Sequence, residues 1–124
     1  MCGIAGIYNY HSDKENQPGI SIKKMLSTIR HRGPDETGLY LGENFGMGSV
    51  RLSIIDIASG QQPLSDESGN YWIVYNGEIF NYPELRNEIL KKGIKLKTHC
   101  DTEVLVQMYA IYGAGCLKYM NGQF

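Results

Sequence analysis

The first residues of the chain constrain its fold and its chemistry more than any other stretch. Cys2 follows the initiator Met1 and opens a short apolar run, residues 3–8, in which glycine and alanine separate larger side chains. Such a run predicts a buried strand that another segment approaches closely. The initiator methionine is usually removed before a small residue, so Cys2 is expected to carry a free α-amine as well as its thiol. Because the ordinary pKa values of these two groups nearly match, one residue then contains both a nucleophile and its base.

A cysteine at this position also has a plainer interpretation. An unpaired cysteine packs more often as a small hydrophobic residue, and a reactive one needs an identifiable activating environment. The other motifs of the chain therefore decide between a catalytic and a packing role for Cys2.

The composition is that of one ordinary domain, and it excludes several classes of protein. The 124 residues carry 12 Lys and Arg against 13 Asp and Glu, so there is no basic excess for binding nucleic acid. No apolar run approaches the ~20 residues of a membrane span, and the N-terminus lacks the pattern of a secretory signal. The three cysteines lack Cys-x-x-Cys spacing, which argues against a disulfide framework and for the reducing cytoplasm; they are Cys2, Cys100 and Cys116.

Apolar periodicity predicts three helices, over residues 22–30, 82–92 and 102–112, with Ser21, Asn81 and Asp101 as N-caps. Glu84, three residues after Asn81, is typical of a capping box. The residues expected to face the core are Ile22, Met25, Leu26 and Ile29 in the first helix, Leu85, Ile89 and Leu90 in the second, and Val104, Leu105, Met108 and Ile111 in the third.

Alternating and β-branched runs predict further strands at residues 37–41, 46–55, 71–75 and 95–98. Residues 11–20 and 56–70 are polar and rich in turn formers, which predicts two loops. The final Gly-Gln-Phe resembles the start of another strand. We therefore expect the chain to be the N-terminal part of a longer domain.

Arg51 is the unusual member of the run 46–55, because arginine is rarely buried among apolar residues unless it is paired. The planar guanidinium suits a carboxylate held by two hydrogen bonds. This pattern is equally consistent with a carboxylate-binding residue and with an internal ion pair to Asp35 or Asp56. The neighbouring segment 30–36, three basic residues followed by Gly-Pro and two acidic ones, is typical of a solvated, salt-linked corner, with a functional loop as the minority interpretation.

Asn76 and Gly77 stand between two apolar runs, where Asn-Gly first indicates a tight turn of a hairpin. The alternative is chemical. The Asn76 amide and the Gly77 backbone N–H are two neighbouring donors, which is what an oxyanion hole for acyl transfer requires.

Asp101 has a structural and a functional interpretation as well. It is a good N-cap, and a partly buried aspartate can also bind an ammonium group. His99 and Cys100 have no second pair of ligands at suitable spacing, so we expect no metal site.

Taken together, these motifs resemble the glutaminase domain of the class II glutamine amidotransferases, most closely that of the glutamine-dependent asparagine synthetases. The resemblance extends over nearly the whole chain, in the order of the family. The matching runs are residues 1–6, 30–35, 51–56, 62–64, 75–82 and 101–103. One departure is Ser49, at a position where the family often carries histidine.

The resemblance implies an α+β fold of the N-terminal-nucleophile type, an αββα sandwich of two antiparallel sheets between helix layers, incomplete at the C-terminus. Residues 1–124 would form the N-terminal part of the glutaminase domain, with a synthetase domain following. No cofactor is expected in this part, whereas ATP and Mg²⁺ are expected in the synthetase domain. The expected partners are glutamine and the C-terminal synthetase domain, with a homodimer as a further candidate and neither nucleic acid nor membrane.

The resemblance also implies a role for each matching residue. Cys2 would attack the side-chain amide of glutamine and form a γ-glutamyl thioester, while Asn76 and Gly77 hold the oxyanion. The substrate would be bound by Arg51 at its α-carboxylate, by Asp101 and Glu78 at its α-ammonium, and by backbone groups near Leu52 and Ile54.

Two alternatives from other classes stand beside this enzyme. The first is a catalytically silent binding module of the same fold, which retention of Met1 would favour because a blocked amine cannot act as a base. The second and weaker is a metal or redox protein built on His31, His99 and Cys100.

Overall fold

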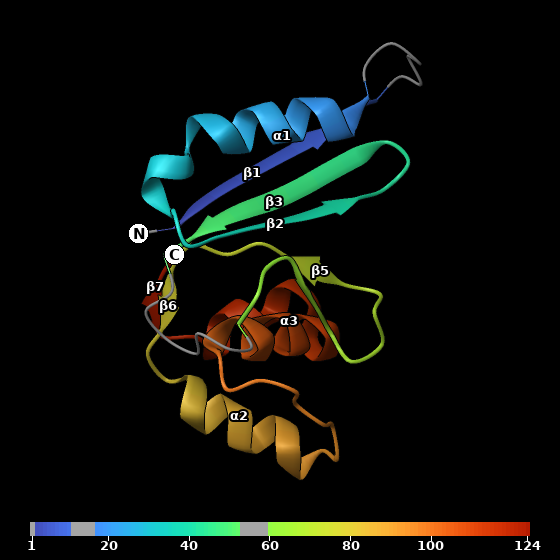
Figure 1. The fold of residues 1–124 in the computed structure, drawn as a ribbon. Helices are drawn as coiled ribbons and strands as arrows, with labels where there is room; N and C mark the ends of the chain where they lie inside the picture. Colours follow the sequence, from blue (N-terminus) through green and yellow to red (C-terminus); the bar gives the residue numbers. More distant parts are fainter. Residues whose placement is uncertain (1, 11–16, 53–59) are drawn as a thin grey trace. The chain divides into compact units, whose positions relative to one another are not determined.

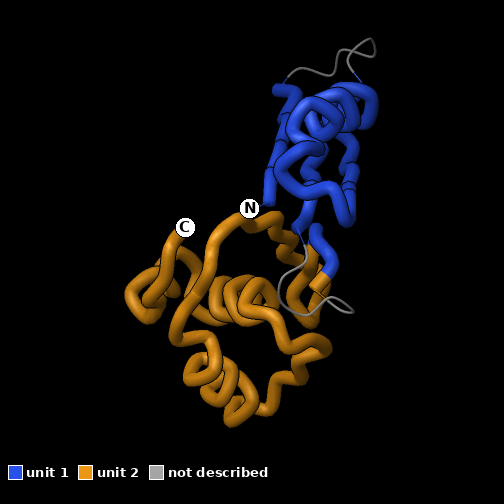
Figure 2. The backbone as a smooth tube through the Cα atoms, turned by 60° about the vertical axis from the view of Figure 1, so that its left-hand side comes forward, with its two compact units in different colours: residues 1–54, 61–63 blue, residues 55–60, 64–124 orange. Residues whose placement is uncertain are grey.

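The structure is a computed structural model that describes residues 2–10, 17–52 and 60–124. The chain divides into two compact units, residues 1–54 with 61–63 and residues 55–60 with 64–124 (Figure 2). Strand pairing is antiparallel in each of them, and each contains helices, so the predicted α+β class is confirmed.

In the first unit, helix α1 covers one face of a three-stranded sheet (Figure 1). The strand order is β1-β3-β2, so the last strand in sequence lies in the middle. The elements are β1 (Gly3–Tyr8), α1 (Pro18–Thr28), the 3₁₀ turn η1 (Arg30–Arg32), β2 (Glu36–Leu41) and β3 (Phe45–Arg51).

Small residues in the sheet allow α1 to approach closely, as the N-terminal glycines predict. A Cβ on Gly48 of β3 would lie 2.6 Å from Leu26 Cδ1, and one on Gly3 would lie 3.0 Å from both Ile29 and Val50. Leu26, Val50 and Ile22 are buried and form the core between the helix and the sheet.

Helix α1 differs from its prediction at the start and on one face. It begins at Pro18 rather than Ile22, so the predicted cap at Ser21 and the predicted loop to residue 20 are wrong there. Proline favours the first helical turn, because its missing N–H would have no partner there. Met25 is 39% exposed, since the short helix turns only a narrow stripe toward the sheet. Beyond Thr28 the chain tightens into η1, whose C-cap is Gly33.

The second unit packs two helices and two small sheets around one core. Its elements are β4 (Leu64–Ser65), β5 (Trp72–Ile73), β6 (Glu78–Ile79), α2 (Tyr82–Lys91), α3 (Asp101–Tyr112), the 3₁₀ helix η2 (Gly113–Tyr119) and β7 (Gly122–Gln123). Strand β4 pairs with β5, and β6 pairs with β7. The buried core is made of Tyr75, Ile79, Leu85, Ile89, Val104, Met108 and Cys116.

Several predictions for the second unit need correction. Residues 95–98 are not a strand, because the N–H groups of Lys97 and Thr98 bind the Glu103 carboxylate instead of a neighbouring strand. Only Trp72–Ile73 of the predicted strand 71–75 is paired. Leu90 is 45% exposed, whereas Leu85 and Ile89 of the same helix are buried as predicted.

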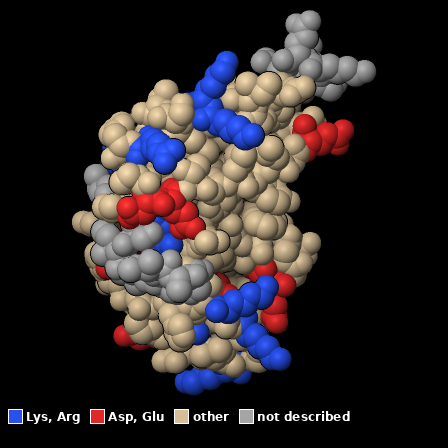
Figure 3. All heavy atoms as spheres, viewed as in Figure 1, with Lys and Arg blue, Asp and Glu red and all other residues tan. Residues whose placement is uncertain are grey.

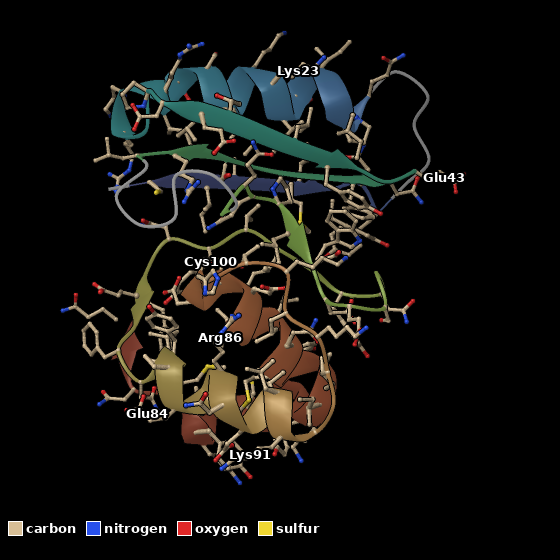
Figure 4. The ribbon with its side chains drawn as sticks, turned by 60° about the horizontal axis from the view of Figure 1, so that its bottom comes forward. Lys23, Glu43, Glu84, Arg86, Lys91 and Cys100 are labelled. Atoms are coloured by element: carbon tan, nitrogen blue, oxygen red, sulfur yellow. The ribbon has the colours of Figure 1, made fainter. Side chains whose placement is uncertain are left out.

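The loop before α3 is held from two sides. The Glu103 carboxylate accepts hydrogen bonds from the Lys97 and Thr98 amides, each at 2.7 Å. From the other side, Arg86 donates to the carbonyl of Thr98 at 2.6 Å. Figure 4 shows Arg86 reaching from α2 toward this loop, where Cys100 also lies, while Glu84 and Lys91 project from the same helix.

The surface agrees with the near-neutral composition. On the face drawn in Figure 3, positive and negative side chains are interspersed, in line with a formal net charge of −1. Within the described ranges, no helix is both long and apolar enough to cross a membrane.

Candidate active site

Cys2 lies at one end of the sheet of the first unit, next to the end of β3. It directly precedes β1, which pairs with β3 so that Gly3 lies opposite Val50. Continuing this register places Cys2 beside Arg51 and Leu52. Its Sγ lies 3.8 Å from the Leu52 carbonyl oxygen, and the residue is half-buried. The thiol is thus both anchored and accessible.

The segment 30–35 closes around the same end of the sheet. Arg32 Nε donates to the Cys2 carbonyl at 3.2 Å, and the Asp35 amide donates to the Arg51 carbonyl at the same distance. A Cβ on Gly33 would lie 2.4 Å from the Val50 carbonyl oxygen, so only glycine fits there. The prediction of a merely solvated corner is therefore wrong for Arg32, which is tied to the backbone of Cys2.

Arg51 is 7% exposed, and its Nη1 lies 3.3 Å from Glu36 Oε2. An internal ion pair therefore exists with Glu36, a partner that the sequence analysis did not name beside Asp35 and Asp56. The register explains the pair, because Glu36 of β2 lies directly opposite Arg51 of β3. Asp56 lies outside the described residues.

In the second unit, Asn76, Gly77 and Glu78 are exposed at the start of β6. The hairpin interpretation of Asn-Gly is wrong, because β5 pairs with β4 and β6 pairs with β7. Close packing explains the glycine: a Cβ on Gly77 would lie 2.3 Å from the Gln123 carbonyl oxygen.

Asp101 is the first residue of α3 rather than its N-cap, which is Cys100. Its Oδ2 accepts a hydrogen bond from the Ile79 amide at 3.0 Å, so the carboxylate is fixed against β6. The structure thus brings Asp101 close to the strand that carries Glu78.

The predicted site residues are distributed over the two units. Cys2, Arg51 and Leu52 belong to the first unit, and the second contains Asn76, Gly77, Glu78 and Asp101. Ile54 lies outside the described residues.

Comparison with known proteins identifies the family. The sequence profile of the glutamine amidotransferase domain matches residues 1–124. The chain belongs to the glutamine amidotransferase domain family.

Relatives of this amidotransferase domain carry the names of larger enzymes. Over its whole length the chain is 45% identical to asparagine synthetase [glutamine-hydrolyzing] 1 of Bacillus subtilis, of which it covers 20%. It is also 38% identical to asparagine synthetase [glutamine-hydrolyzing] 1 of Arabidopsis thaliana, of which it covers 21%. The chain thus spans about a fifth of the length of these relatives.

The three cysteines of this amidotransferase domain differ in access. Cys100 is 5% exposed and Cys116 is 2% exposed, whereas Cys2 is half-buried. Burial also raises the pKa of the Cys116 thiol, which disfavours its reactive thiolate. Among the described residues, no three His, Cys, Asp or Glu side chains are grouped so as to hold a metal ion.

Two further residues support the amidotransferase motifs through contacts that the sequence did not predict. Ser49, where the family often has histidine, is buried and donates to the Gln62 carbonyl at 3.2 Å. The sequence places Tyr75 in the expected strand 71–75 and in the matching run 75–82 but gives it no task of its own; in the structure its hydroxyl lies beside Gly77 and donates to the Gln123 carbonyl at 3.4 Å. Its position directly before Asn-Gly was the available signal.

Proposed function

We propose that this chain hydrolyses glutamine to glutamate and ammonia, with Cys2 as the nucleophile. The observation that carries the proposal is the end of the sheet in the first unit. There, three of the motif runs meet around a half-buried cysteine that directly follows the initiator methionine. Membership of the glutamine amidotransferase domain family supports this assignment.

The proposed reaction begins when the α-amine of Cys2 takes the thiol proton and the sulfur attacks the side-chain amide carbon of glutamine. The carbonyl oxygen gains a negative charge, which the Asn76 amide and the Gly77 N–H would stabilise. The tetrahedral intermediate then collapses, and the protonated amine gives its proton to the leaving ammonia. Water hydrolyses the remaining γ-glutamyl thioester and releases glutamate.

Recognition of glutamine would depend on its charged α-substituents. Arg51 would bind the α-carboxylate. Its guanidinium has five N–H donors, and the ion pair with Glu36 through Nη1 holds the group in place. Asp101 and Glu78 would bind the α-ammonium, and backbone groups near Leu52 and Ile54 would complete the pocket.

We further propose that residues 1–124 are the N-terminal part of a glutaminase domain with the N-terminal-nucleophile sandwich fold. The remaining domain would supply further strands to both sheets, and a synthetase domain using ATP and Mg²⁺ would follow. The ammonia would pass to that domain and amidate its acceptor. The names of the relatives, and their length of about five times that of this chain, support this proposal.

Labelling of the full-length protein with a glutamine-mimicking electrophile tests the proposed function. Peptide mapping should place the label on Cys2, glutamine should protect it, and Cys2→Ala should lose both the label and glutaminase activity. Cys116→Ala is the matched control and should keep the label. Equal labelling of Cys2 and the two buried cysteines would contradict the proposal, and so would an intact mass that retains Met1, since the amine would then be blocked.

A further inference from the structure

Tyr75 lies against the Asn76–Gly77 corner from inside the second unit. Its side chain is 8% exposed, although the two residues that follow it are exposed. A Cβ built on Gly77 would lie 2.5 Å from the Tyr75 hydroxyl oxygen and 2.7 Å from its Cζ. The ring thus turns back beneath the residue two positions later and contacts its Cα.

The same hydroxyl joins the corner to the last strand. It donates to the Gln123 carbonyl at 3.4 Å, and that carbonyl oxygen also lies 2.3 Å from the Cβ position of Gly77. Gln123 is in turn paired with Glu78 in the β6–β7 ladder. The backbone of Gly77 is therefore enclosed on its buried side by one hydroxyl and one carbonyl.

We propose that Tyr75 is a positioning residue for the oxyanion-binding corner, which fixes the direction of the Gly77 N–H. The inference rests on the proposed function, because it assigns a task to a residue behind the proposed oxyanion donor. A preorganised donor stabilises the transition state most, since no reorganisation is needed when the charge develops. Tyr75 would thus act on the chemical step and not on the binding of the substrate's α-substituents.

The surroundings keep Tyr75 in the form that can donate. Burial raises the pKa of its phenol well above the ordinary value, and the negative charges of Asp101 and Glu78 raise it further. The hydroxyl therefore keeps its proton across the range in which the enzyme would work. The Tyr75 hydroxyl can therefore donate its hydrogen bond to the Gln123 carbonyl at any physiological pH.

The test compares Tyr75→Phe with Tyr71→Phe in the full-length protein. Tyr71 is a suitable control because it lies in the same segment, is 44% exposed and contacts the Tyr109 ring edge-on. Tyr75→Phe should lower kcat for glutamine hydrolysis about tenfold, less than the loss of an oxyanion donor itself, with KM unchanged within about twofold. Tyr71→Phe should leave both constants unchanged.

Two inhibitors separate positioning from a general defect. Glutamate γ-semialdehyde would form a hemithioacetal with Cys2, and the oxygen of this adduct would occupy the oxyanion position. Tyr75→Phe should therefore lower the affinity for this inhibitor by about the same factor as it lowers kcat. Glutamate cannot form that adduct, so its inhibition constant should be the same in Tyr75→Phe as in the wild type. Alkylation by iodoacetamide, which needs no oxyanion site, should also be unchanged.

A third variant keeps the inference falsifiable if Tyr75→Phe folds poorly. The residue 4-aminophenylalanine at position 75 retains a donor at the end of the ring and should restore most of kcat. The inference is overturned by an unchanged kcat in Tyr75→Phe, by equal weakening of both inhibitors, or by failure of the amino variant to restore activity. If instead the wild type shows no glutaminase activity, or Cys2→Ala keeps it, the proposed function itself fails.

Discussion

The carboxylate of Asp101 accepts a hydrogen bond from the backbone amide of Ile79, with 3.0 Å between Oδ2 and N. This bond joins the first turn of α3 to β6, two residues after Gly77. Asp101 therefore has a structural task in the folded chain whether or not it also binds the ammonium group of a substrate.

Substitutions of Asp101 should separate these two tasks. Asn keeps an oxygen that can accept the hydrogen bond from the Ile79 amide, but it removes the charge. The free energy of unfolding of Asp101→Asn should therefore lie within about 1 kcal/mol of the wild-type value. Its KM for glutamine should nevertheless rise about tenfold or more. Asp101→Ala loses both tasks and should cost about 1–3 kcal/mol of stability as well. Denaturant unfolding and steady-state kinetics measure the two effects, and a normal KM in Asp101→Asn would contradict the ammonium-binding role.

Gly77 should tolerate no side chain. The Cβ of Gly77→Ala would lie 2.3 Å from the Gln123 carbonyl, so the backbone must shift and the free energy of unfolding should fall by about 1–3 kcal/mol. Gly115→Ala is the matched control, because a Cβ there meets nothing within 4 Å. Thermal unfolding of both variants provides the comparison. Equal stability of the two would show that β7 does not pack on the corner as described.

Local patterns predicted much of this fold, and the failures share a cause. The sequence predicted β1 and β2, the end of α3 at Gly113 and the strand at Gly122–Gln123, because each depends on neighbouring residues. It could not predict the Arg51–Glu36 pair, which follows from the register of two strands. The expected strand at 95–98 failed because of another side-chain contact that alternation of residue types does not reveal: the Glu103 carboxylate, in the following helix, accepts hydrogen bonds from the Lys97 and Thr98 amides.

Asn81 illustrates how tertiary contacts override a local motif. It occupies the N-cap position of α2, but within the described residues its side chain makes no cap hydrogen bond. Instead, Nδ2 donates to the Tyr119 carbonyl and Oδ1 accepts from the Asn121 amide, each at 2.9 Å. The predicted capping box with Glu84 is therefore wrong.

This bridge predicts an unusual response to a good capping residue. Asn81→Asp would be neutral or stabilising at an ordinary N-cap. Here it removes the donor and places a negative charge beside the Tyr119 carbonyl, so we expect a loss of about 0.5–1.5 kcal/mol. Urea unfolding at pH 7 measures the loss. A gain in stability would instead favour the capping role.

The pairing of Arg51 with Glu36 should matter more for stability than for recognition. Glu36→Gln leaves the mostly buried guanidinium beside a neutral amide, which should cost about 1 kcal/mol, because the partly exposed Glu36 limits the effect. KM for glutamine should change little, since Arg51 itself remains. Arg51→Lys, which loses the planar fork, should raise KM about tenfold. Equal effects of the two variants on KM would place Glu36 in substrate binding instead.

Asp66 should make the β4–β5 hairpin sensitive to acid. Burial alone would raise the pKa of this carboxyl, but hydrogen bonds from the Ser68 hydroxyl and from the Tyr71 and Ser68 amides outweigh it, so the pKa lies below the ordinary aspartate value. Because the folded pKa is depressed, the stabilisation is complete above the unfolded pKa of about 3.9 and is lost as the pH falls through the folded pKa.

Asp66→Asn gives this effect a measurable form. The variant lacks the charge that these hydrogen-bond donors stabilise, so its free energy of unfolding should be about 1 kcal/mol lower than that of the wild type at pH 7. The difference should remain constant down to about pH 5 and narrow below about pH 4, where the unfolded chain begins to protonate this carboxyl while the folded protein still keeps it ionised. Urea unfolding of both proteins at a series of pH values measures it, and Glu67→Gln, on the exposed neighbour, is the control. A difference that stays constant to pH 3 would show that the charge of Asp66 does not stabilise the hairpin.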